Sequence, residues 1–167
     1  RALMNGSTNT WMPTMIMEVF GTTPLYSQIS TLVFPLLNVL GIYLGIYTLK
    51  KVKNEVLTAG IYFAVCILPF AGLIFMKDTG FAFSIILIGL VNIFSYSYFV
   101  ILNSSIASCY RKTGKIAMIS SLLNTFGSVG FILSGYTLGR IADLTDWNII
   151  IYIWIGISAA AAALCFI

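Results

Sequence analysis

The chain has 167 residues, of which 59% are hydrophobic and 8% are charged, and its formal net charge is +4. Soluble globular domains carry about 25% charged residues, so this composition excludes a water-soluble domain and indicates that a bilayer solvates most of the chain. The sequence has no histidine, which excludes a histidine-based catalytic group or metal site within this chain.

Long segments almost free of charge follow one another from the first residues to the last. A bilayer core about 30 Å thick is crossed by about 20 helical residues, whereas barrel strands would alternate over about ten residues. The long runs therefore favour helices, and they predict an all-α, polytopic membrane protein with a six-transmembrane-helix bundle. The predicted spans are about 2–20, 27–49, 56–76, 81–108, 116–138 and 148–167.

The predicted connections are short, and none of them can hold a folded soluble domain. They are Gly21 to Tyr26, Lys50 to Glu55, Lys77 to Gly80, Tyr110 to Lys115 and Gly139 to Trp147.

Basic residues concentrate in two of these connections. Lys50, Lys51 and Lys53 follow the second span, and Arg111, Lys112 and Lys115 follow the fourth, whereas Lys77 and Arg140 stand alone in theirs. Connections rich in lysine and arginine stay in the cytoplasm. We therefore expect an integral protein of a bacterial plasma membrane with both chain ends cytoplasmic. The positive charge reflects this bias and does not indicate a nucleic-acid partner.

Polar residues are shared unequally among the six spans. The first and fourth spans carry asparagine, serine and threonine at helical spacing, while the third and sixth are almost wholly apolar. Polar side chains are costly in hydrocarbon unless they face a partner or a water-filled cavity. We expect the first and fourth helices to line a cavity, the second and fifth to flank it, and the third and sixth to be peripheral. The alternative is that these polar residues only bond between helices.

The candidate solute-binding residues share these polar faces. They are Asn5, Thr8, Asn9, Asn92, Ser95, Tyr96, Asn103 and Asn124. The order of polar, flanking and apolar spans repeats every three helices. It predicts two inverted three-helix repeats, an arrangement typical of secondary transporters.

The three cysteines, Cys66, Cys109 and Cys165, have neither metal-ligand spacing nor the pattern of a disulfide framework. We expect no metal and no cofactor. Arg1 leads directly into a helix without the layout of a signal peptide. Residues 1–167 are therefore expected to be a fragment that lacks an upstream part.

Several short motifs occur in an order that resembles one transporter superfamily. They are Trp11-Met12-Pro13, the Lys50–Lys53 connection, Arg111-Lys112-Thr113-Gly114-Lys115, Phe126-Gly127-Ser128-Val129-Gly130 and Gly139-Arg140-Ile141-Ala142-Asp143. The whole chain resembles the C-terminal six-helix half of a major facilitator superfamily transporter. The nearest resemblance is to organophosphate:phosphate antiporters and sugar-phosphate permeases. Asn5 stands where those proteins place an arginine that holds phosphate.

The resemblance implies secondary active transport of a small polar or anionic solute by alternating access. It implies no enzymatic activity, and its partners are the lipid bilayer, the solute and the absent N-terminal six-helix half. The alternatives are a self-standing six-helix carrier or channel subunit that acts as an oligomer, and a non-transporting sensor with a transporter fold. A lipid-modifying transferase would need an acidic, histidine or metal constellation, which the sequence does not show.

Overall fold

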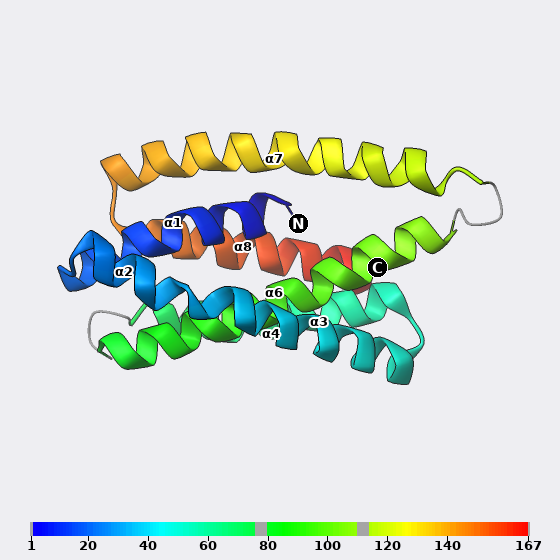
Figure 1. The fold of residues 1–167 in the computed structure, drawn as a ribbon, viewed down its shortest axis with the longest axis horizontal. Coiled ribbons are helices and arrows are strands. Elements are labelled where there is room, and N and C mark those ends of the chain that lie inside the picture. Colours follow the sequence, from blue (N-terminus) through cyan, green and yellow to red (C-terminus); the bar gives the residue numbers. More distant parts are fainter. Residues whose placement is uncertain (1, 76–79, 110–113, 167) are drawn as a thin grey trace.

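The computed structural model describes residues 2–75, 80–109 and 114–166, with side chains except those of 2–7, 104–109 and 143. These residues form long helices joined by short connections (Figure 1), which confirms the all-α prediction. The helices are α1 (Ala2–Phe20), α2 (Pro24–Thr31), α3 (Val33–Val52), α4 (Glu55–Leu73), α6 (Phe81–Cys109), α7 (Ile116–Leu144) and α8 (Trp147–Phe166). Helices α2 and α3 follow each other across Leu32 and together form the predicted second span.

Local sequence sets the ends of the helices. Thr23 caps α2 by accepting a hydrogen bond from the backbone N–H of Tyr26, and Pro24 occupies the first turn, where its missing N–H costs nothing. Lys53 adopts a left-handed φ of 57° that ends α3, and Asn54 Oδ1 accepts from the N–H of Leu57 at 3.1 Å. Because Lys50 to Val52 remain helical, the α3–α4 connection is shorter than predicted.

The predicted connection from Gly139 to Trp147 is wrong over most of its length. Helix α7 continues to Leu144, and only Thr145 and Asp146 separate it from α8. Gly139 does not end the helix because it packs beneath the indole of Trp11. Charged residues beyond it are compatible with a helix that projects past the hydrocarbon.

Five segments of the described residues are long and apolar enough to cross a membrane, whereas six spans were predicted. They are Pro24–Val52, Glu55–Leu73, Phe81–Asn103, Ile116–Ala142 and Trp147–Phe166. Helix α1 is not among them, because its asparagines, serine and threonines lower its mean hydropathy.

The core forms where α6 lies between α3 and α4, and α4 in turn packs against α8. Helix α1 packs mainly against α7. The ring of Phe63 on α4 stacks on Tyr98 of α6 with centroids 4.0 Å apart, and Phe70 contacts Trp154 of α8. The prediction that the third span is peripheral is therefore wrong, since α4 is half-buried along its length. Apolar residues suit a protein core as well as lipid, so hydropathy alone did not distinguish the two.

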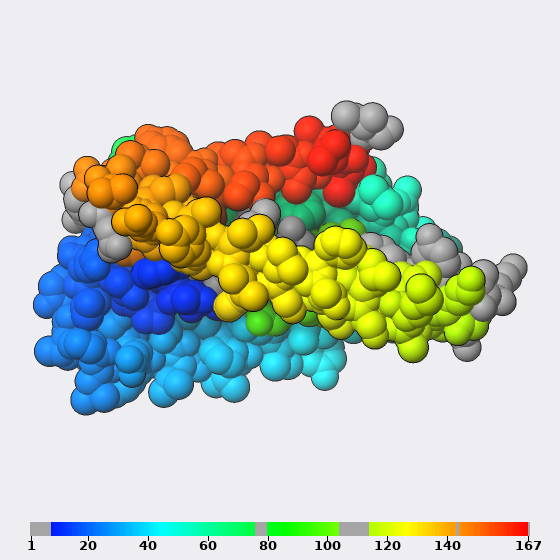
Figure 2. All heavy atoms as spheres, turned by 90° about the horizontal axis from the view of Figure 1, so that it is seen from above, coloured from blue at the N-terminus to red at the C-terminus, as the bar shows by residue number. Residues whose placement is uncertain are grey.

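Helix α7 differs from its prediction in the opposite sense, because it is less buried than expected. It lies along the outside of the bundle (Figure 2), and no residue of its most apolar stretch is buried. It was predicted to flank a cavity, yet its N-terminal half has little protein around it.

The helices alternate in direction, so the connections gather at two ends (Figure 1). Lys50, Lys51, Lys53 and Lys115 lie at what we call the basic end. Gly21 and Trp147 lie at the opposite end. Helix α1 begins near the middle of the bundle, and α8 ends toward the basic end.

Candidate functional site

Helix α6 packs extensively against α3 and α4 and makes a few contacts with α1 and α7. On one face, the hydroxyl of Ser97 donates to the backbone oxygen of Gly41 on α3 at 2.7 Å. On another, Tyr98 stacks on Phe63 of α4. The spacing i, i+4, i+7 and i+11 places a polar and aromatic set on the third face. This set is Asn92, Tyr96, Phe99 and Asn103.

Asn92 lies where this third face meets α1. Its side chain is 3% exposed, and Nδ2 donates to the backbone oxygen of Ile88 at 3.0 Å and contacts the sulfur of Met12 at 3.5 Å. Thr8 is 2% exposed and lies one turn before Met12 on the same face of α1. Thr8 and Asn92 therefore belong to one polar region between α1 and α6.

Buried polar side chains on three helices share a similar depth. Measured from the end opposite the basic end at 1.5 Å per residue, Thr8, Asn38 and Asn92 lie about 18, 21 and 16 Å along α1, α2–α3 and α6. A hydrocarbon core about 30 Å thick has its midplane near this depth. We refer to Thr8, Asn38 and Asn92 as the midplane layer.

Two polar atoms near this layer are buried without a hydrogen-bond partner. They are Nε1 of Trp11, a donor, and Oδ1 of Asn38, an acceptor. Trp11 rests on Gly139 of α7, and Asn38 shares the α6-facing side of α3 with Gly41. Leaving such a group unsatisfied costs about 1–3 kcal/mol. One buried donor and one buried acceptor are therefore unsatisfied within the described part of the structure.

The remaining α6 candidates divide between two faces. Tyr96 and Asn103 are half-buried on the third face, and the ring of Tyr96 lies 5.6 Å from that of Phe99. Ser95 instead turns toward α4, where its Oγ lies 3.8 Å from the sulfur of Cys66. Ser95 thus contributes to the α4–α6 interface.

Two further candidates are exposed elsewhere on their helices. Asn9 is exposed on α1, and Asn124 is exposed on the N-terminal half of α7, where its carbonyl accepts from Ser128 Oγ at 3.0 Å. The side chain of Asn5 and all of Arg1 lie outside the described residues. The structure therefore brings Thr8 and Asn92 together and leaves Asn124 apart from them.

Sequence reasoning missed Trp11 and Asn38 as site residues. Asn38 had a usable signal, because it precedes the Gly41-x-x-x-Gly45 pair by one turn and so shares its close-packed face. Trp11 had none, since a tryptophan in the middle of a helix packs equally well against lipid or a neighbouring helix.

Among the described residues, no group of three or more histidine, cysteine, aspartate or glutamate side chains is placed to hold a metal ion. No family model, curated protein or solved structure matches this chain. Its fold and hydropathy show a multi-span helical membrane protein.

Proposed function

We propose that the chain is half of a secondary active transporter that moves a small polar or anionic solute by alternating access, as in the C-terminal half of a major facilitator permease or antiporter. The midplane layer is the observation that carries this proposal. Buried polar groups in hydrocarbon are expensive, and they typically mark a solute or ion pathway. Transporters place their sites near the midplane, where both sides of the membrane can reach them in turn.

The packing order of the helices supports a pair of three-helix repeats. The helices form two consecutive groups of three. The first group is α1, α2–α3 and α4, and the second is α6, α7 and α8. The second member of each group then packs on the first member of the other, since α3 lies on α6 and α7 lies on α1. The third members, α4 and α8, pack on each other. Two inverted repeats related by a twofold axis would produce these three pairings, although the extensive α4–α6 contact has only a small counterpart between α8 and α1.

The exposed helices support a partner half. Helices α3 and α7 are the least buried of the five apolar spans, and Figure 2 shows α7 lying along the outside of the bundle. Aromatic side chains on them are exposed, including Tyr43, Tyr47, Phe126 and Tyr136. We place the docking surface of an N-terminal six-helix half on these exposed faces of α3 and α7.

Transport by the full-length protein in proteoliposomes tests the proposal. The assay measures uptake and exchange of labelled sugar phosphates, carboxylates and neutral polar solutes. We expect one class to be transported, and Asn92→Ala to reduce its uptake at least about tenfold, because losing hydrogen bonds to a bound polar solute costs on the order of 1.5–3 kcal/mol.

Asn124→Ala is the matched control, because it makes the same change at an exposed position of α7. It should retain uptake near that of the unmodified protein, and both variants should unfold at similar temperatures. Absence of flux for every solute class would refute transport, and ligand binding without flux would favour a sensor.

A further inference from the structure

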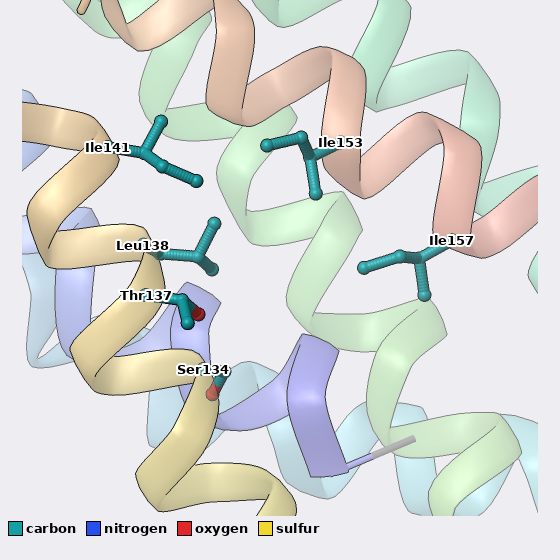
Figure 3. Close-up of a pocket in the computed structure, with 6 residues that line it drawn as sticks. All are labelled: Ser134, Thr137, Leu138, Ile141, Ile153 and Ile157. Carbon is teal, nitrogen blue, oxygen red and sulfur yellow. The ribbon is translucent and has the colours of Figure 1, made fainter. Parts of the chain in front are cut away.

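A crevice separates α7 from α8 although these helices are consecutive in the chain. Its volume is about 140 Å³ (Figure 3). Figure 3 shows Leu138 and Ile141 of α7 directed toward Ile153 and Ile157 of α8 across the gap. The two helices make few direct contacts. The described side chains leave this space open.

The lining of the crevice is mostly aliphatic, and its hydroxyl groups have no free hydrogen-bond donor. Four of its side chains are aliphatic, and the other two are the hydroxyls of Ser134 and Thr137. Ser134 donates to the backbone oxygen of Phe131 at 2.8 Å, and Thr137 donates to that of Leu133 at 2.7 Å. Both hydroxyl protons are used within α7, so the crevice offers no donor to a polar ligand. It suits an uncharged hydrocarbon.

The depth of the crevice places it beside hydrocarbon. Ile153 and Ile157 lie about 9 and 15 Å along α8 from Trp147, at 1.5 Å per residue. Both helices are apolar enough to cross a membrane. The crevice therefore lies at hydrocarbon depth, in the half of the core opposite the basic end.

We propose that this crevice binds one acyl chain of a phospholipid from that leaflet. A dry cavity of about 150 Å³ lined by aliphatic residues takes apolar guests and excludes water, and an empty one forfeits dispersion contacts with its lining. The bound chain replaces the missing helix–helix packing between α7 and α8. It thereby holds α7, whose main protein contact is α1, against the rest of the bundle.

Photo-crosslinking tests the site on the full chain in phospholipid bilayers. The probe is phosphatidylcholine with a diazirine placed either midway along an acyl chain or close to the headgroup, and adducts are mapped by mass spectrometry of peptides. We expect the mid-chain probe to label residues 134–141 and 153–157 several-fold above other exposed parts of α7 and α8. The probe near the headgroup should label this region much less.

Ser134→Leu fills the crevice and should abolish the enrichment. Ser128→Leu is its matched control, because Ser128 also donates to a carbonyl of its own helix but is exposed, and it should leave the enrichment unchanged. Thr137→Val removes a hydroxyl at constant shape and should also retain labelling. Even labelling along α7 and α8 in the unmodified protein would overturn the proposal.

Discussion

At the scale of single residues, Gly41 and Gly45 determine how closely α3 approaches α6. A methyl group at Gly45 would lie 2.8 Å from the backbone oxygen of Ser97, and one at Gly41 would overlap the backbone oxygen of Ile93. Neither neighbour is a flexible side chain that can turn away. The close approach also permits the bond from Ser97 to Gly41.

Gly41→Ala should therefore destabilise the protein by about 1–3 kcal/mol, the usual cost of overpacking, despite the better helix propensity of alanine. Thermal unfolding in detergent, followed by circular dichroism, measures the effect. Gly135→Ala is the control, since no atom lies within 4 Å of the added methyl group. It should be neutral or slightly stabilising. Equal stability of the two variants would contradict the tight α3–α6 crossing.

A second residue-scale contact joins α1 to α8 at the end opposite the basic end. Trp147 Nε1 donates to Glu18 Oε2 at 2.8 Å. Glu18 is exposed, so water competes for its carboxylate and the coupling should be modest, about 1 kcal/mol. A double-mutant cycle with Trp147→Phe and Glu18→Ala measures it by thermal unfolding. Strictly additive effects would show that the two side chains do not interact in solution.

At the scale of elements, α7 differs from one end to the other. Its C-terminal half contains buried Ser134 and Leu138 and packs on α1, whereas residues 116–133 are exposed or half-exposed. Segments with few packed neighbours open at low free energy. Amide hydrogen exchange in detergent should therefore be faster in 117–133 than in 134–142, and slowest in α4. Uniform protection along α7 would contradict this gradient.

The sequence predicted which segments are helical but not what each helix touches. Charge-free runs located the helices because the bilayer requires internally bonded backbone over about 20 residues. The same apolar composition allowed α4 to be assigned to lipid, although Phe63 and Phe70 pack on other helices. Packing between helices depends on which side chains fit together. The hydropathy of a segment measures its polarity and gives no information about its packing partners.

The candidate site was also only partly predictable, because the sequence does not show which helices contact each other. Helical spacing identified the face that carries Asn92 and Asn103, because that periodicity is a property of one helix alone. It also assigned Ser95 to the same face, although Ser95 lies at its margin and turns to Cys66. The spacing of Asn38 from Gly41 is visible in the sequence, but the unpaired buried atoms of Asn38 and Trp11 appear only once their neighbours are known.

At the scale of the whole molecule, packing divides the helices into two unequal groups. Helices α3, α4, α6 and α8 form a continuous series of extensive contacts, whereas α1 and α7 pack mainly on each other. The α1–α7 contact is made through the side chain of Trp11 on Gly139, whereas α3 and α6 meet backbone to backbone. A conformational change would therefore displace the α1–α7 pair with less disruption than any helix of the larger group.

The orientation of the molecule in the membrane follows from its basic end. Lys50, Lys51 and Lys53 should keep that end in the cytoplasm. In intact bacterial cells and a cysteine-free background, a membrane-impermeant maleimide should label Thr23→Cys and Asp146→Cys at the opposite end. Lys53→Cys should react only after the cells are permeabilised. All three side chains are exposed on the protein. A difference in their labelling in intact cells therefore reports the side of the bilayer on which each lies. Labelling of Lys53→Cys in intact cells, with Thr23→Cys and Asp146→Cys protected, would reverse the orientation and place the lipid crevice in the cytoplasmic leaflet.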